Sequence, residues 1–150
     1  MKLSRILPLI CLIVTPIVTQ ARIIDVSTEA EYEELLSKGQ PALVKFAANW
    51  CGVCNRVKNV FNEVSRDPKF RDITFVRVDI EKAPELRKKN GIVGVPSFLF
   101  MYGNEQRKES VGIRNMQTFK EDLCKDLRST FELAECDCPS DDDEKTSEDA

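Results

Sequence analysis

The chain has 150 residues, of which 42% are hydrophobic and 31% are charged, and its formal net charge is −3. This length and composition are typical of one soluble domain, and the small net charge without a basic cluster argues against a nucleic-acid partner. The sequence has no histidine, which excludes Cys-His and Ser-His catalysis, zinc sites with histidine ligands and haem bound through histidine.

Residues 1–21 have the pattern of a secretory signal peptide. Lys2 and Arg5 give it positive charge, residues 6–18 form its apolar segment, and residues 19–21 form a small-residue cleavage site. The apolar segment has 13 residues, whereas a helix that spans a bilayer needs about 20. We therefore expect an exported protein (secreted, periplasmic or in a secretory-pathway lumen) without a stable membrane anchor. A leader that is retained as an anchor is the alternative.

The rest of the chain alternates between strand and helix patterns. Thr28 and Glu31 match a capping box, which predicts that a helix begins there. Strand patterns, rich in β-branched and aromatic residues, cover residues 23–26, 42–47, 73–80, 96–102 and 107–111. Helical patterns begin at Thr28, Cys51, Ala83 and Met116, and they end before Gly39, Asp67 and Asn90 and at Phe131.

The order of these elements is βαβαβαββα. Alternation in the first part predicts parallel strands joined by helices, and the Gly103-Asn104 turn predicts a hairpin that adds antiparallel strands. We therefore expect an α/β fold over residues 22–131, with a central mixed sheet flanked by helices. Residues 132–150 contain two cysteines and an acidic run, and we expect them to form a disordered tail.

The stretch Trp50-Cys51-Gly52-Val53-Cys54 (WCGVC) carries the chemistry. Two thiols separated by two residues can close a small disulfide ring, and the start of a helix lowers the pKa of a thiol below its usual value of about 8.5. Cys51 would then attack a partner disulfide, and Cys54, one turn deeper, would resolve the mixed disulfide. The same spacing occurs in zinc ribbons and structural disulfides. A zinc site of four thiolates usually needs a second such pair, however.

Together with residues 94–97 (GVPS), the WCGVC motif resembles the thioredoxin superfamily, and the similarity extends over residues 23–127. The resemblance implies a thioredoxin fold and a thiol–disulfide oxidoreductase of the thioredoxin or protein disulfide isomerase type, acting on cysteine-containing proteins or peptides. It assigns Cys51 as the attacking cysteine and Cys54 as the resolving one. It implies that the protein needs no cofactor and no metal. It also implies a redox partner, which the sequence does not identify. We expect a monomer.

The resemblance also implies a substrate groove next to the cysteines. Pro96 matches the cis-proline of the family, which would turn the backbone of Val95 outward to pair with an extended substrate. Trp50, Val53, Val95 and Gly112 would frame this shallow, apolar groove. The alternatives are a trans proline that begins an edge strand and a Trp50 that belongs to the core.

Two positions depart from the family pattern. Lys45 stands where thioredoxins and disulfide isomerases usually have a buried carboxylate that relays a proton to the resolving thiol. Either Lys45 extends to solvent, which we favour, or its charge stabilises the Cys54 thiolate and makes the pair more oxidising. Arg77 is another basic position that would crowd it. Val53 replaces the usual proline or histidine. Lys45 and Gly52 are thus expected to tune the redox potential, and the direction (reductase, isomerase or oxidase) stays open.

The three remaining cysteines outside the predicted leader admit several roles. We expect Cys124 to form a structural disulfide with Cys136 or Cys138, as is common in exported proteins. A second redox pair, Cys136–Cys138, and a site for a soft metal are the alternatives. For the chain as a whole, the alternative to an oxidoreductase is a client-binding or chaperone-like module with little catalysis, and the third possibility is a metal carrier.

Overall fold

A computed structural model describes residues 23–133, so the predictions on the leader and on residues 134–150 lie outside the described residues. The strands are β1 (Ile24–Val26), β2 (Pro41–Ala47), β3 (Thr74–Asp79), β4 (Ser97–Tyr102) and β5 (Glu105–Val111). The helices are α1 (Glu29–Ser37), α2 (Gly52–Arg56), α3 (Lys58–Val64), α4 (Pro84–Lys89) and α5 (Phe119–Phe131), with a 3₁₀ turn at Pro68–Phe70.

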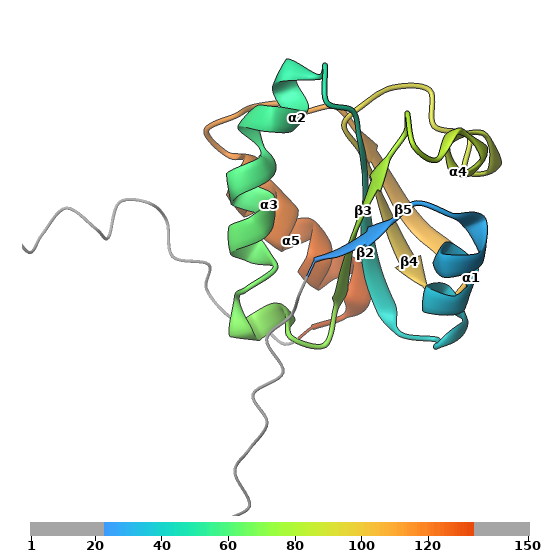
Figure 1. Ribbon diagram of the computed structural model, residues 1–150. Coiled ribbons are helices and arrows are strands. Elements are labelled where there is room, and N and C mark those ends of the chain that lie inside the picture. The colour runs from blue at the N-terminus through green and yellow to red at the C-terminus, as the bar shows by residue number, and fades with distance from the viewer. Residues whose placement is uncertain (1–22, 134–150) are drawn as a thin grey trace, which may run out of the picture.

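The strands form one mixed sheet in the order β1-β3-β2-β4-β5. Strands β1, β3 and β2 are parallel, whereas β4 runs antiparallel to both β2 and β5. Figure 1 shows α3 and α5 on one face of the sheet and α1 and α4 on the other. The α/β class, the order of the elements and the mixed sheet predicted from the sequence are therefore confirmed.

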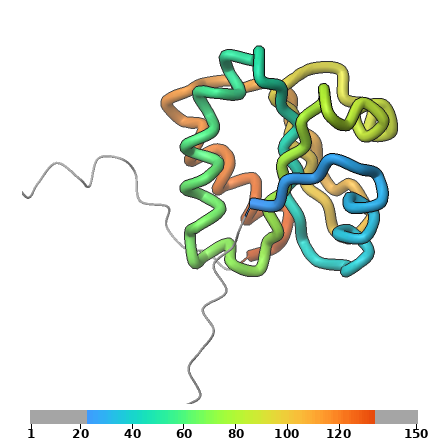
Figure 2. Tube along the Cα trace, in the orientation of Figure 1, coloured from blue at the N-terminus to red at the C-terminus, as the bar shows by residue number. Residues whose placement is uncertain are grey.

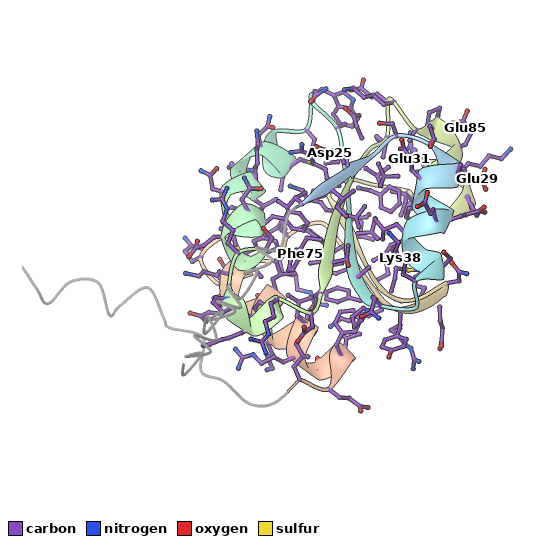
Figure 3. All side chains as sticks on the ribbon, turned by 60° about the horizontal axis from the view of Figure 1, so that its bottom comes forward. Asp25, Glu29, Glu31, Lys38, Phe75 and Glu85 are labelled. Atoms are coloured by element: carbon purple, nitrogen blue, oxygen red, sulfur yellow. A yellow bond between two sulfur atoms is a disulfide. The ribbon has the colours of Figure 1, made fainter. Side chains whose placement is uncertain are left out.

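Each face of the sheet has its own apolar core. Residues of β2 alternate between the two faces: Val44 and Phe46 pack with the α1 and α4 side, and Leu43 packs with the α3 and α5 side. Because helices cover both faces, five consecutive residues of β2 are buried. Figure 3 shows the side chains that fill both layers, with Glu29 and Glu85 at the outer surface. Lys45, one residue after Val44, therefore faces the α3 side.

Several element boundaries differ from the sequence prediction by one to three residues. The helix that begins at Cys51 divides at Val57, whose N–H donates to the carbonyl oxygens of Val53 and Asn55 and whose ψ of −2° is less negative than that of a regular α-helix. The last helix begins at Phe119 instead of Met116, because the side chain of Asn115 accepts from the Gln117 N–H at 2.9 Å and holds a turn there. The final strand begins two residues earlier than predicted, at Glu105.

The functional motifs meet at one end of the sheet. In Figures 1 and 2 the turn between β2 and α2 lies at the same end as the segment that precedes β4, and Cys51 Sγ lies 3.7 Å from the Val95 carbonyl oxygen. Parallel strands end at a common edge, and in open α/β sheets that edge is the usual place for a site. Among residues 23–133, the helices are all too short or too polar to cross a bilayer.

Candidate active site

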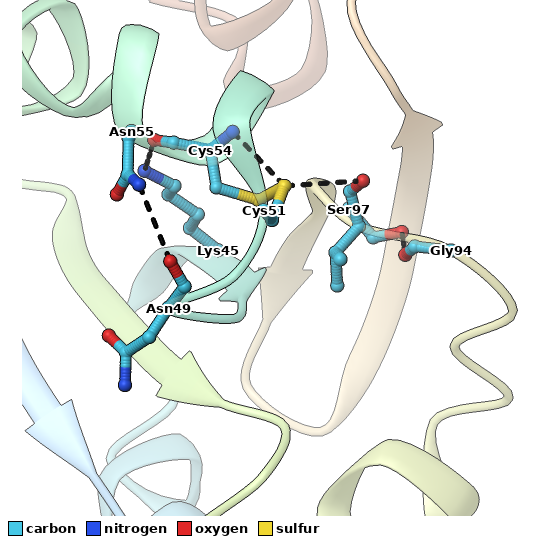
Figure 4. Close-up of a disulfide and its surroundings, with 8 residues drawn as sticks. Lys45, Asn49, Cys51, Cys54, Asn55, Gly94 and Ser97 are labelled. Carbon is cyan, nitrogen blue, oxygen red and sulfur yellow. Dashed lines mark hydrogen bonds between the residues drawn. A yellow bond between two sulfur atoms is a disulfide. The ribbon is translucent and has the colours of Figure 1, made fainter.

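The site is built on a disulfide between Cys51 and Cys54, whose Cα atoms are 5.2 Å apart. Cys51 is the N-cap of α2, and its Sγ accepts a hydrogen bond from the Cys54 N–H at 3.1 Å. The turn that carries it is held by the Cys51 N–H, which donates to the Ala48 carbonyl at 3.2 Å, and by the Asn55 side chain, which donates to the Asn49 carbonyl at 3.4 Å (Figure 4). The backbone N–H at a helix start thus points at the first sulfur, where it would stabilise a thiolate.

The segment before β4 lies against this disulfide. The Val95–Pro96 peptide bond is cis, as the family resemblance implied, and the Val95 carbonyl oxygen lies beside Cys51 Sγ. Ser97 Oγ donates to the Gly94 carbonyl at 2.7 Å, and the Gly112 N–H donates to the Pro96 carbonyl at 2.7 Å. Gly112 has φ +72°, a left-handed conformation that glycine adopts without strain. It therefore ties the end of β5 to the segment next to the cysteines.

Exposed apolar side chains flank the disulfide. Trp50 is 67% exposed, so the alternative of a core aromatic is wrong, while Val53 and Val95 are half-buried against the core. Sequence reasoning missed two further residues, Val93 and Val111, which are 82% and 50% exposed. A Cβ on Gly94 would lie 3.5 Å from Val111 Cγ1, which places Val111 beside the GVPS segment. Val93 could have been found from the sequence, because it is an apolar residue that directly precedes the GVPS segment.

Lys45 does not reach solvent, contrary to the interpretation we favoured from the sequence. Its side chain is only 2% exposed, because β2 is the central strand of the sheet and α3 covers this face. Lys45 Nζ donates to the Cys54 carbonyl oxygen at 3.4 Å and lies 5.2 Å from the centre of the Phe61 ring. Burial, followed by the positive charges of Arg77 and Lys58, lowers the pKa of Lys45 to about 8.

A cavity of about 350 Å³ lies behind the disulfide, and both Lys45 and Cys54 line it. Arg77 is the register partner of Lys45 on β3, so the predicted crowding of these two cations is confirmed. Asp25 binds the Arg77 guanidinium, with Nη2 at 2.7 Å from Oδ2, and raises the pKa of Arg77. Asp25, one of the two carboxylates that line this cavity, is therefore engaged by Arg77 and not by Lys45.

The sequence model of the thioredoxin family matches residues 23–125. This chain belongs to the thioredoxin family. A thioredoxin of Mycoplasmoides gallisepticum is 33% identical over 96 residues, which are 64% of this chain and 94% of that protein. Solved thioredoxins of Halobacterium salinarum (a mutant form) and Malassezia sympodialis have the same fold. The Halobacterium structure has a TM-score of 0.66 and 23% identity, and the match covers 77% of this chain and 96% of that one. The Malassezia structure also has a TM-score of 0.66, with 20% identity, and the match covers 74% of this chain and 92% of that one.

As a thioredoxin-family protein, the chain is a thiol–disulfide oxidoreductase with Cys51 and Cys54 as its CxxC pair. The remaining cysteine predictions are not decided. Cys124 is buried on α5, and its predicted partners Cys136 and Cys138 lie outside the described residues. Within residues 23–133, histidine, cysteine and carboxylate side chains do not gather in groups of three or more that could hold a metal ion.

Proposed function

We propose that the protein is exported and exchanges disulfides with cysteine-containing proteins through Cys51 and Cys54. The observation that carries the proposal is the position of Cys51 Sγ, which caps α2 next to the Val95 carbonyl. A client that lies along this segment in an extended conformation would pair with its backbone and bring a sulfur to Cys51. The exposed Trp50, Val93 and Val111 supply apolar contacts for side chains of such a client.

A single turnover needs no reactant other than the client. When the protein reduces a client, the Cys51 thiolate attacks one sulfur of the client disulfide, and the electron pair of the broken bond leaves on the second client sulfur. Cys54 then attacks Cys51 Sγ, which forms the Cys51–Cys54 bond and releases the first client sulfur as a thiolate. Two electrons have passed to the client, whose thiolates take up protons from solvent. Oxidation of a client dithiol is the reverse sequence, and a second redox partner resets the pair in either case.

The activity is tested by reduction of insulin disulfides and by refolding of a scrambled disulfide protein. We expect wild type to catalyse both, Cys51→Ser to catalyse neither, and Cys54→Ser to accumulate mixed disulfides with clients, because it attacks but cannot resolve. Equal activity of wild type and Cys51→Ser would refute the enzymatic proposal. If Cys51→Ser also bound unfolded clients as tightly as wild type, the client-binding module would be the better description.

Export is supported by the charged start, the apolar segment and the cleavage pattern of residues 1–21. We expect these residues to direct a fused reporter out of the cytosol and the exported protein to begin at Arg22. Replacing Leu9 and Ile10 by aspartate would interrupt the apolar segment and keep the reporter inside the cell, whereas the same exchange at Glu33 and Glu34 would leave export unchanged. A reporter that stays in the cytosol with the unaltered leader would refute this part of the proposal.

A further inference from the structure

Lys45 places a buried ammonium next to a redox disulfide. Lys45 and Cys54 are both almost fully buried, and the contact of Lys45 Nζ with Cys54 is a single long hydrogen bond of 3.4 Å to its carbonyl oxygen. A buried lysine is costly unless an opposite charge lies close to it. Within residues 23–133, ion pairs involve other basic side chains, and none joins Lys45 to a carboxylate.

The surroundings of Lys45 add positive charge and little negative charge. The charged groups that face its cavity are Asp25 from β1, Arg77 and Asp79 from β3, Lys82 from the following turn and Lys58 from α3. Asp25 is bound by Arg77, and Asp79 accepts from the Asn49 side chain at 3.3 Å and from the Glu81 N–H at 3.0 Å. Lys45 contacts the Cys54 carbonyl of α2 and the Phe61 ring of α3, and its register partner on β4 is Phe98; none of these three residues carries a charge in the disulfide form.

Reduction of the disulfide changes this balance. In the disulfide form Cys54 is neutral, so the Lys45 ammonium faces only like charges and two engaged carboxylates. When the disulfide opens, Cys54 Sγ can carry a negative charge in the same cavity. The ammonium then gains a counter-charge from a buried neighbour, where electrostatic attraction is stronger than at the surface. A positive charge beside a thiol favours its thiolate and stabilises the reduced form of a CxxC pair.

We propose that Lys45 is a positioning residue that holds a proton opposite the Cys54 thiolate, stabilises the reduced pair, and biases this protein toward oxidising client dithiols. This inference rests on the proposed exchange function and assigns its direction. A client thiolate attacks Cys51 Sγ, the Cys51–Cys54 bond breaks, and its electron pair leaves on Cys54 Sγ, next to the cavity that Lys45 and Cys54 share. A second client thiolate attacks the client sulfur of the mixed disulfide and displaces Cys51 as a thiolate. The client becomes a disulfide, the protein gains two electrons, and a disulfide-bearing partner must reoxidise it.

The test is the equilibrium constant of the Cys51–Cys54 pair with reduced and oxidised glutathione at pH 7. The variants are Lys45→Met, Lys45→Gln and the conservative Lys45→Arg, with Lys58→Met as the matched control, because Lys58 carries the same charge at the exposed rim of the same cavity. For a thiol that is ionised at pH 7, a change of one pKa unit alters the equilibrium about tenfold. We expect Lys45→Met and Lys45→Gln to shift the constant about tenfold toward the disulfide, which is about 30 mV lower in potential.

The conservative and control variants separate charge from packing. Lys45→Arg keeps the charge and should stay within threefold of wild type, and Lys58→Met should do the same, because water screens an exposed cation. In a Cys51→Ser background, Lys45→Met should raise the pKa of the Cys54 thiol by about one unit. The rate of alkylation of this thiol across pH measures that pKa. A purely structural role would leave that titration unchanged.

Two failures are distinguishable. If wild type equilibrates with glutathione but Lys45→Met and Lys45→Gln have the same constant as wild type, or become more oxidising, the role of Lys45 is refuted and the exchange function stands. If wild type does not equilibrate with glutathione and Cys51→Ser retains its effect on clients, the exchange function itself is refuted. Lys45→Gln keeps the test decisive if Lys45→Met does not fold, since glutamine leaves a polar group in the cavity.

Discussion

Replacing Lys45 by methionine should make the oxidised protein more stable, although it removes a hydrogen bond. Folding lowers the pKa of Lys45 from 10.5 to about 8, and one pKa unit corresponds to about 1.4 kcal/mol. The buried ammonium therefore reduces the free energy of unfolding by at most about 3.5 kcal/mol below pH 8. Exposed residues at the rim of the cavity admit water, which screens the charge and brings the expected cost nearer 2 kcal/mol. Methionine fills a similar volume without a charge.

The pH dependence provides the sharper measurement. Between pH 8 and 10.5 the unfolded chain binds more protons at Lys45 than the folded protein does, so the free energy of unfolding rises with pH in that window. We expect wild type to gain about 1 to 2 kcal/mol relative to Lys45→Met between pH 7 and 9.5. Tyr32 has its pKa raised to about 12 by burial, so it holds its proton longer in the folded state and lowers stability only above pH 10.

The assay is urea unfolding of both oxidised proteins at the two pH values, followed by circular dichroism. Subtracting the variant from wild type cancels the titration of Tyr32 and of the other cysteines, which both proteins share. The reasoning about Lys45 is wrong if Lys45→Met is less stable than wild type at pH 7. It is also wrong if the two proteins change equally between pH 7 and 9.5.

Three further substitutions test other parts of the structure. Thr28→Ala removes the hydroxyl that accepts from the Glu31 N–H at 3.3 Å at the start of α1, and it should lower the free energy of unfolding by about 1 kcal/mol, whereas Ser27→Ala, just outside the cap, should change it little. Gly112→Ala places a Cβ at φ +72° in open space. Denaturant unfolding should therefore show that the free energy of unfolding falls by about 1 to 2 kcal/mol from backbone strain alone. An unchanged midpoint would show that the turn relaxes. Trp50→Ala should slow the reduction of insulin about tenfold, because a protein client is large enough to contact the exposed ring. The rate of reduction of a small aromatic disulfide should stay within twofold of wild type. Equal losses of rate on both substrates would indicate that the substitution perturbs the disulfide itself.

The sequence was sufficient for the fold because local patterns and topology agreed. The capping box at Thr28, the β-branched central strands and the Gly103 turn each predicted an element that the structure contains, in an order that leaves few possible sheets. The helix after Cys51 was predicted as continuous, since its apolar spacing does not reveal the ψ of −2° at Val57, where α2 ends and α3 begins. Periodicity reports which face of a helix is buried and says little about one residue's ψ.

The site was predictable where a motif defines it and not where it depends on packing across elements. Cys51, Cys54 and Pro96 could be read from WCGVC and GVPS, because those residue types are tied to the chemistry. The burial of Lys45 could not be read locally. It depends on β2 being central, on Arg77 lying opposite in the β3 register and on α3 covering that face. A lysine on an edge strand with the same sequence neighbours would have extended to water.

The stability and the redox potential of this protein must be linked through Lys45 by a thermodynamic cycle. The cycle joins the folded and unfolded chain in the oxidised and reduced forms, and position 45 affects only the folded states, because the unfolded chain keeps its ammonium in water. A tenfold shift in the glutathione equilibrium on Lys45→Met therefore has to reappear as about 1.4 kcal/mol in unfolding free energies. If the variant gains about 2 kcal/mol in the oxidised form, it should gain only about 0.6 kcal/mol in the reduced form, because there the ammonium of wild type has the Cys54 thiolate as its counter-charge. Urea unfolding at pH 7 with and without a reductant measures both gains independently of the glutathione assay. Equal gains in the two forms require an unchanged glutathione equilibrium, and that pair of results would refute the coupling of Lys45 to the Cys54 thiolate.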